Sequence, residues 1–218
     1  MSITSSHFKN YMDRLKYNEV VKILTDKNFS IFFVDDFTRL FNISPQKASK
    51  FLTRNSKQSS NFIKIKRGLY IFAPNSPIKF EVANKIYQPS YISFETALSY
   101  YNIIPEAVYT ITSATTKNTK DLEIQNTSYK YYKLKKELFF GYKPVTIQQK
   151  IVLMADKEKA LLDYIYLASL KKKSILNERM NLSKIDKDKW GYYVKLFKEK
   201  IRKNKALVET IKIIYKAL

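Results

Sequence analysis

The chain has 218 residues, which is enough for one large domain or two small ones. Hydrophobic residues make up 45% of it and charged residues 27%, a composition typical of a globular protein and not of a disordered one. The 40 Lys and Arg residues outnumber the 19 Asp and Glu residues, which gives a net charge of +21. Such a surplus favours a polyanionic partner, of which nucleic acid is the commonest. Because an A/T-rich genome also enriches Lys, the placement of the charge has to decide.

The residue inventory excludes most of the common catalytic sites. Without Cys, the chain has no disulfide, no thiolate zinc site and no cysteine nucleophile. A single histidine, His7, does not favour a Ser-His-Asp triad or a histidine metal cluster. The glycines, Gly68, Gly141 and Gly191, lie too far apart for a dinucleotide fingerprint or a P-loop. No Asp or Glu is followed two positions later by Lys, the usual end of a nuclease metal site. We therefore expect no enzyme activity, no cofactor and no bound metal.

The apolar segments of the chain are short. The runs Ile31–Val34 and Ile151–Ala155 are far below the length of a membrane-spanning helix, and the N-terminus lacks the apolar core of a signal peptide. The sequence therefore predicts a cytoplasmic protein without a membrane partner.

Basic charge is densest in the first part of the chain. Residues 1–79 contain 14 basic and 5 acidic residues, and the longer remainder contains 26 and 14. The 44 residues from Phe37 to Phe80 include nine basic residues and no carboxylate. A genomic bias adds lysine, but it does not remove every Asp and Glu from a folded segment. This asymmetry indicates a surface for an anionic partner.

The pattern of apolar residues and helix caps predicts six elements in this first part. They are a helix from Asn18 to about Asp26, a strand at Ser30–Phe33, a short helix from an Asp35 cap to about Asn42, a helix opened by Ser44-Pro45, and two strands, Phe62–Lys66 and Leu69–Phe72. Ser at the N-cap and Pro at the first helical position are a strong helix start. Arg67 and Gly68 are expected to form a tight turn between the last two strands.

This order of elements is that of a winged helix-turn-helix, whose second motif helix enters the major groove of DNA. The helix after Ser44 has Ala48, Phe51 and Leu52 on its buried side and polar or basic residues on the other. The candidate DNA-binding residues are Gln46, Lys47, Ser49, Lys50, Thr53 and Arg54 on this helix and Lys64, Lys66 and Arg67 in the hairpin. Lys binds phosphate, whereas Arg, Gln, Ser and Thr also read base edges. The alternative is an ordinary solvated lysine face.

The second part of the chain is expected to mix helices and strands. Helices are predicted at Glu81–Tyr87, Phe94–Tyr101, Lys157–Leu170, Trp190–Ile201 and Lys205–Leu218, and strands at Val108–Thr115, Ser128–Leu134 and Gln149–Ala155, the last of them buried. The fold class is therefore α+β. A winged helix-turn-helix domain is expected over residues 1–79 and a mixed α/β domain with terminal helices over residues 80–218.

Three groups of side chains in the second part admit more than one interpretation. The residues expected in the core are Tyr91, Ala97, Leu98 and Tyr101. Glu158 and Asp163 lie five positions apart on one helix, hence on different faces, and are expected to be cap and surface residues rather than a catalytic pair. An aromatic group fits an amphipathic strand but could also stack on single-stranded bases. Its members are Tyr129, Tyr131 and Tyr132, with Lys130 and Lys133 between and after them.

Several segments, taken together, resemble a known protein family. They are Lys66–Tyr70, Pro89–Tyr101, Ile104–Glu106, Tyr109–Lys117, Phe139–Tyr142 and Ala155–Asp163. The second, with the sequence PSYISFETALSYY, is the most specific. These segments resemble the antitoxin and transcriptional-regulator family of bacterial abortive-infection type E systems, which are type IV toxin–antitoxin pairs. The resemblance extends from about Val34 to Leu170.

The resemblance implies a phage-defence regulator whose winged helix binds repeated operator sites and represses its own operon. It also implies a C-terminal domain that counters a nucleotidyltransferase-like toxin encoded alongside, directly or indirectly. Partners would be double-stranded DNA of the promoter and that toxin. By this resemblance, DNA contact carries over to Gln46, Lys47, Lys50, Thr53, Arg54, Lys66 and Arg67. Two alternatives stay open: a nucleic-acid-processing enzyme, such as an unusual nuclease, and an RNA-binding regulator.

Overall fold

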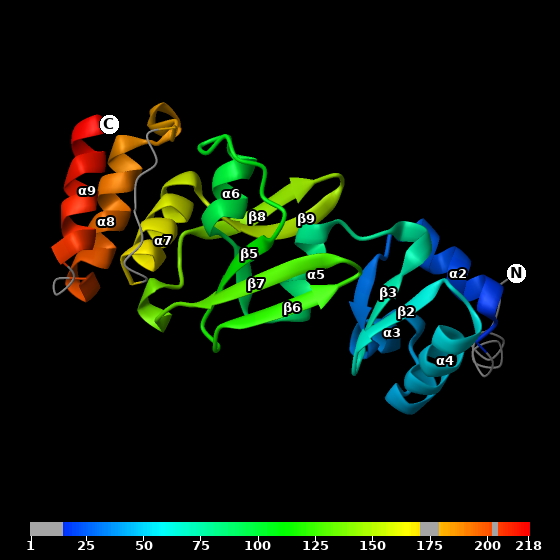
Figure 1. Cartoon of the computed structure of the whole chain (residues 1–218). Coiled ribbons are helices and arrows are strands. Elements are labelled where there is room, and N and C mark those ends of the chain that lie inside the picture. The colour runs from blue at the N-terminus through cyan, green and yellow to red at the C-terminus, as the bar shows by residue number, and fades with distance from the viewer. Residues whose placement is uncertain (1–14, 171–178, 202–204) are drawn as a thin grey trace, which may run out of the picture. The chain divides into compact units, whose positions relative to one another are not determined.

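A computed structural model describes residues 15–170, 179–201 and 205–218 of the chain (Figure 1). The fold is α+β, as the sequence predicts. It divides into two compact units, Met1–Ile78 and Lys79–Leu218, called unit 1 and unit 2 below. The sequence predicts the division one residue later, after Lys79. The single histidine, His7, lies outside the described residues. No helix in the described ranges is both long and apolar enough to cross a membrane.

Unit 1 combines helices with a small antiparallel sheet of strand order β1-β3-β2 (Figure 1). In chain order its elements are α2 (Tyr17–Asp26), β1 (Ile31–Phe33), α3 (Val34–Phe41), α4 (Pro45–Gln58), β2 (Phe62–Lys66) and β3 (Leu69–Phe72), followed by a 3-10 turn at Ala73–Asn75. The six elements expected from the sequence of this part are present, with ends shifted by at most two residues.

The core of unit 1 lies between one face of the sheet and the three helices. Phe32, Phe62, Tyr70 and Phe72 share that face, because opposed residues of antiparallel strands point to the same side. The helices contribute Val20, Leu24, Phe37, Phe41, Ala48 and Leu52 to the same cluster. Unit 1 therefore has a hydrophobic core of its own.

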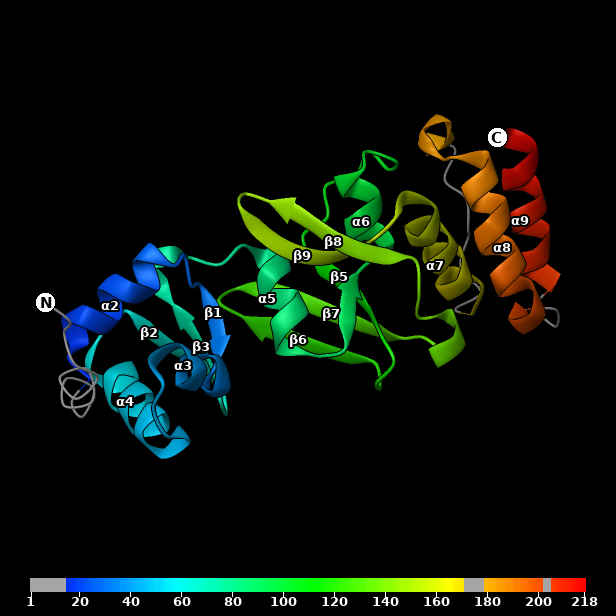
Figure 2. The same ribbon diagram turned by 180° about the vertical axis from the view of Figure 1, so that it is seen from behind.

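Unit 2 is built on a six-stranded mixed sheet with the order β6-β7-β5-β4-β9-β8 (Figures 1 and 2). The strands are β4 (Ser90–Ile92), β5 (Ile111–Thr115), β6 (Lys120–Ile124), β7 (Thr127–Lys133), β8 (Tyr142–Ile147) and β9 (Lys150–Ala155). β4 runs parallel to β9 and β5 parallel to β7, whereas the other neighbours are antiparallel. The sequence does not predict β4, β6 or β8.

Helices cover both faces of this sheet. They are α5 (Lys79–Ile86), α6 (Phe94–Tyr100), α7 (Lys157–Leu170), α8 (Lys187–Ile201) and α9 (Lys205–Ala217). α5 packs on one face, where the hydroxyl of Tyr131 donates a 2.6 Å hydrogen bond to the carbonyl of Ala83. α6 and α7 pack on the other face, and α8 and α9 pack against α7 (Figures 1 and 2).

A buried ion pair joins α7 to β4. Lys159 and Asp163 lie one turn apart on α7, and both side chains are fully buried. Lys159 donates hydrogen bonds to Asp163 and to the hydroxyl of Tyr91, and Asp163 accepts from the hydroxyls of Tyr91 at 3.0 Å and Ser93 at 2.8 Å. Burial raises the pKa of the Asp163 carboxyl and lowers the pKa of the Lys159 ammonium, and their mutual attraction opposes both shifts.

The surroundings of α7 correct two expectations from the sequence. Glu158 and Asp163, expected at a cap and at the surface, are both buried. α7 is surrounded by β9, α6, α8 and α9. Because most of its sides are covered, helical periodicity in the sequence does not distinguish its buried charged residues from exposed ones. The prediction that the strand at Gln149–Ala155 is buried is wrong for two residues of β9, since Ile151 is 72% exposed and Leu153 is 37% exposed.

Candidate nucleic-acid interface

α4 begins at the turn that the sequence predicts. Asn42 ends α3 in the left-handed conformation, with φ 47°. The hydroxyl of Ser44 accepts a hydrogen bond from the N–H of Lys47 at 3.3 Å, and Pro45 occupies the first helical position. α3 and α4 are therefore two consecutive helices joined by a short, well-capped turn.

The nine residues predicted to contact DNA are all exposed. They are Gln46, Lys47, Ser49, Lys50, Thr53 and Arg54 on α4 and Lys64, Lys66 and Arg67 in the hairpin. On α4, Ala48 and Leu52 are buried, and Gln46, Lys50 and Thr53 lie on the opposite side at helical spacings of four and three residues. The helix thus has one apolar and one polar face.

Lys57 is a residue of this face that the prediction omits. It is exposed and lies seven positions after Lys50 and four after Thr53, so it continues the same line along α4. This spacing is readable in the sequence, and it is the signal that identifies Lys57.

The hairpin and α4 meet at Tyr70. Tyr70 of β3 lies opposite Lys64 of β2, so their side chains leave the sheet on the same face. The hydroxyls of Tyr70 and Thr53 lie 3.4 Å apart, which places the polar side of α4 beside that face. The exposed face of α4 and Lys64 therefore belong to one surface, called the α4–hairpin surface below.

Gly68 shapes the tip of the hairpin. Its φ of +78° lies in the left-handed region, and no heavy atom lies within 4 Å of the position that a Cβ would take, so backbone conformation and not space requires glycine there. Its carbonyl accepts the N–H of Val34 at 2.9 Å, which ties the tip to the start of α3. The register of β2 shifts between Lys64 and Lys66, and such a bulge redirects side chains at the end of a hairpin.

The charges of the α4–hairpin surface are not neutralised by carboxylates of the same elements, because the chain has none from Phe37 to Phe80. Arg54 donates from Nε to the side-chain oxygen of Gln58 at 3.1 Å. Within the described residues its terminal guanidinium nitrogens, with four of its five N–H donors, form no hydrogen bond or ion pair. By contrast, Arg39 of α3 is paired with Asp36 at 2.6 Å.

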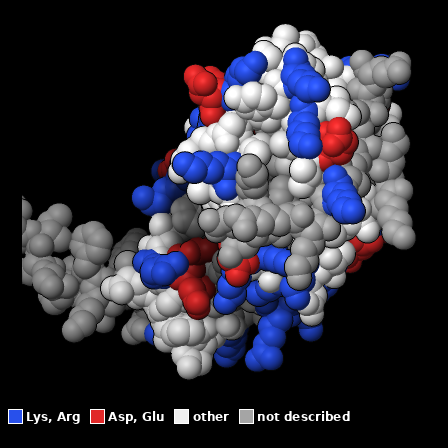
Figure 3. Space-filling model, turned by 90° about the vertical axis from the view of Figure 1, so that its left-hand side faces the viewer, with Lys and Arg blue, Asp and Glu red and all other residues white. Residues whose placement is uncertain are grey.

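Positive charge alone does not distinguish this surface. The side of unit 2 that α8 and α9 form also carries many Lys and Arg side chains, but Asp and Glu lie among them (Figure 3). Lys212 pairs with Glu209 at 3.7 Å, and Lys189 pairs with Asp156 at 2.8 Å. The α4–hairpin surface differs because α4 and the hairpin contain no Asp or Glu of their own, the pattern expected for a polyanion-binding surface.

The structure excludes one alternative nucleic-acid site. Tyr129, Tyr131 and Tyr132 are 2%, 0% and 9% exposed, so their rings are not available for stacking on bases. Burial also raises the pKa of Tyr129 to about 12. These tyrosines are therefore core residues of an amphipathic strand.

The other predicted core residues of unit 2 are placed as follows. Tyr91, Ala97 and Leu98 are fully buried, as expected. Tyr101 is half-buried, and its hydroxyl donates to the carbonyl of Ala155 at 3.0 Å.

Among the residues that the structure describes, no cluster of three or more His, Asp or Glu side chains could hold a metal ion.

Comparison with known proteins does not assign the chain. No family model matches it, and no curated protein matches it. Function therefore has to be inferred from the geometry of the site and from the resemblance in sequence.

Proposed function

We propose that unit 1 is a winged helix-turn-helix that binds duplex DNA. In this proposal α3 and α4 are the helix-turn-helix, α4 is the recognition helix, and β2 and β3 are the wing. The observation that carries the proposal is the α4–hairpin surface, which is exposed, basic and without carboxylates of its own. A surface of this kind suits the phosphate backbone, which dominates the affinity of proteins for DNA.

Two kinds of side chain on α4 suit two kinds of contact. Lys50 and Lys57 offer compact charges, which fit phosphates. Arg54, Gln46 and Thr53 can form directional hydrogen bonds to base edges in the major groove. Both kinds lie on one exposed helical face, as a recognition helix requires.

Binding of the full chain to three nucleic acids tests the proposal. They are the duplex upstream of the chain's own reading frame, a scrambled DNA duplex of equal length, and double-stranded RNA of the upstream sequence. We expect the upstream DNA to bind most tightly, with an affinity that falls as salt rises. The RNA should bind weakly, because side chains cannot read its deep, narrow major groove. Preference for RNA, equal binding to all three, or metal-dependent cleavage of any of them would contradict the proposal.

We further propose that the chain represses its own operon and acts as the antitoxin of a type IV toxin–antitoxin pair. The support is the resemblance in sequence, together with the way its segments meet in unit 2. Tyr91 and Ser93, in the segment Pro89–Tyr101, both donate hydrogen bonds to Asp163, in the segment Ala155–Asp163. These two segments of the resemblance therefore meet in the core of unit 2.

A growth assay tests the antitoxin proposal separately from DNA binding. The nucleotidyltransferase-like gene expected beside this one is expressed with the full chain or with residues 1–78 alone. We expect the full chain to restore growth and the short fragment to fail, because antitoxicity is assigned to unit 2. Restored growth with the fragment alone, or no rescue by the full chain, would contradict this assignment.

A further inference from the structure

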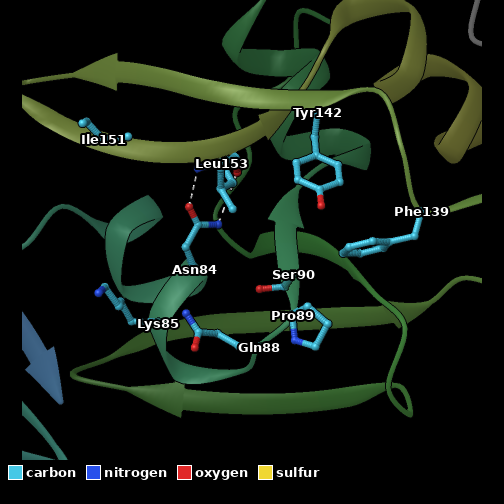
Figure 4. A pocket seen from close by; sticks show the side chains of 9 residues that line it. All are labelled: Asn84, Lys85, Gln88, Pro89, Ser90, Phe139, Tyr142, Ile151 and Leu153. Atoms are coloured by element: carbon cyan, nitrogen blue, oxygen red, sulfur yellow. Dashed lines mark hydrogen bonds between the residues drawn. The ribbon is translucent and has the colours of Figure 1, made fainter. Parts of the chain in front are cut away.

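A pocket of about 480 Å³ opens in unit 2 beside α5 (Figure 4). Its volume is within the range of small-molecule sites, about 300–1,000 Å³. Its walls come from α5, β4, β8 and β9 and from the segments that precede β4 and β8. All the residues that line it belong to unit 2.

The pocket exists because two neighbouring strands part. β4 and β9 pair at Ile92 and Met154. Before this point the backbone of β9 forms hydrogen bonds with a side chain of α5 instead. The side-chain amide of Asn84 donates to the carbonyl of Leu153 at 3.2 Å and accepts from its N–H at 2.6 Å (Figure 4). Asn84 thus replaces a strand as the partner of Leu153 and keeps the start of β4 apart from β9.

Ser90 provides an unsatisfied hydroxyl on the wall of this pocket. The residue is 4% exposed, and its Oγ has no hydrogen-bond partner within the described chain. Figure 4 shows the hydroxyl directed away from β4, toward the side where Asn84 and Gln88 lie. Buried polar atoms in proteins nearly always have a partner. Ser113 also has a buried hydroxyl without one, but Ser90 differs because it lines the pocket, where a ligand can supply the partner.

The lining changes character from one side of the pocket to the other. Phe139 and Tyr142 lie on one side, Lys85 lies on the other, and Ser90 and Gln88 lie between them (Figure 4). The Tyr142 ring is supported from behind by the ring of Tyr91, with centroids 4.4 Å apart and planes 13° apart. No carboxylate lines the pocket.

We propose that this pocket binds a nucleoside monophosphate. The base would lie against Phe139 and Tyr142, the sugar hydroxyls would bond to Ser90 and Gln88, and the phosphate would face Lys85. An aromatic wall, neutral polar groups and a cation match these three parts of the ligand in order. An ammonium group has three N–H donors, so a contact of Lys85 within the chain still leaves donors for a phosphate. The proposal does not depend on DNA binding by unit 1.

Calorimetric titration of the full chain with AMP, GMP, CMP and UMP, one at a time, tests the proposal. We expect saturable binding of at least one of them, with one site per chain. Ser90→Ala and Lys85→Gln should each weaken it about tenfold, the change expected when a ligand loses one hydrogen bond to a polar or charged group. Ser90→Ala should leave the melting temperature unchanged, because the lost oxygen has no partner in the described chain.

Two matched controls define the outcomes. The hydroxyl of Ser113 is also buried and has no hydrogen-bond partner within the described chain, and Lys79 lies on α5 outside the pocket lining. Ser113→Ala and Lys79→Gln should therefore bind as the wild type does. No binding of any nucleotide at about 1 mM would overturn the proposal. It would equally be overturned if inorganic phosphate or the free nucleoside bound as tightly, or if Ser90→Ala and Lys85→Gln had no effect.

Discussion

Lys159 shows how a single buried residue positions a helix. It bonds to Asp163 on its own helix and to Tyr91 on β4, and all of these polar atoms lie out of contact with water. Gly141 makes room for it, since a Cβ there would lie 2.9 Å from the Cγ of Lys159. Removing two charges from water costs free energy that can exceed their attraction, so the pair is not by itself a source of stability. Its hydrogen bonds to Tyr91 and Ser93 join α7 to β4 and to the residue that follows it.

Removing one charge of this pair is expected to lower the free energy of unfolding more than removing both. Lys159→Met leaves the carboxylate of Asp163 buried without a counter-ion, and the free energy of unfolding should fall by about 3–5 kcal/mol. The double variant Lys159→Met, Asp163→Leu should lose less than Lys159→Met alone. Urea unfolding followed by the fluorescence of the buried Trp190 measures both. A double variant that is less stable than Lys159→Met would contradict this.

Single residues differ in how well the sequence predicts them. Ser44 and Gly68 were predictable because a helix cap and a tight turn are decided by their immediate neighbours. Asp163 was not, because a Lys and an Asp four residues apart are usually an exposed pair, and here distant elements bury them. Ser90 has no signal in the sequence at all, since its unsatisfied hydroxyl results from the divergence of β4 and β9.

α8 shows how an element is docked by charge. Asp156, just before α7, accepts a hydrogen bond from the hydroxyl of Tyr193 at 2.7 Å and pairs with Lys189 at 2.8 Å, both on α8. Burial raises the pKa of the Asp156 carboxyl, but Lys189 and Tyr193 outweigh it, and the pKa stays below its usual value.

The contribution of Asp156 to stability should disappear in acid. Its pKa is lower in the folded chain than in the unfolded one, so the contribution is complete above the unfolded pKa of about 3.9 and is lost as the pH falls through the folded pKa. Asp156→Asn should therefore be less stable than the wild type at pH 7 by about 1–3 kcal/mol, and the difference should shrink below about pH 4. Thermal unfolding at both pH values measures it. A difference that stays constant with pH would show that Asp156 does not act through its charge.

On α4, Arg54 and Lys50 should differ in selectivity. A guanidinium can hold O6 and N7 of guanine together, so Arg54→Ala should weaken the upstream duplex by about 1–3 kcal/mol and a scrambled duplex much less. Lys50→Ala should weaken both alike and lower the salt slope by about one. Fluorescence anisotropy with each duplex separates the two effects. Equal weakening of both duplexes by Arg54→Ala would assign Arg54 to the phosphates instead.

The elements that the sequence does not predict have short or mixed patterns. β4 has three residues, β6 alternates charged and apolar residues at an edge of the sheet, and β8 is an edge strand that contains Pro144. Their strand conformation depends on pairing with partners that are distant along the chain. α7, by contrast, has the bounds predicted, because its apolar residues repeat over fourteen positions.

For the whole molecule, the presence of a separate core in unit 1 makes its independence testable. The cluster between the sheet and α2, α3 and α4 consists entirely of residues between Val20 and Phe72. A fragment of residues 1–78 should therefore unfold cooperatively and bind the upstream duplex without unit 2. Circular dichroism and anisotropy measure the two properties. An unfolded fragment, or a folded fragment without affinity, would contradict the independence of unit 1.

The α+β class follows from the sequence, because helical and strand patterns occur in both parts of the chain. The α4–hairpin surface could be predicted because its helix residues share one exposed face and its hairpin follows directly in sequence. The pocket of unit 2 could not, since it depends on where one strand leaves another. Local sequence patterns thus predict one helix face and one hairpin, whereas the pocket depends on the tertiary arrangement of the strands.

DNA binding by the α4–hairpin surface is tested most directly by the salt dependence of duplex binding by the full chain. One triple variant removes three exposed lysines of this surface: Lys50→Gln, Lys57→Gln and Lys64→Gln. The matched control removes three exposed lysines elsewhere, with the same net charge: Lys22→Gln, Lys79→Gln and Lys212→Gln. Each phosphate contact adds about 0.9 to the magnitude of the negative slope of log K against log salt. We therefore expect the magnitude of the slope to decrease by about two to three units in the first variant. In the control it should stay unchanged. Equal slopes in the two variants would contradict DNA binding by this surface.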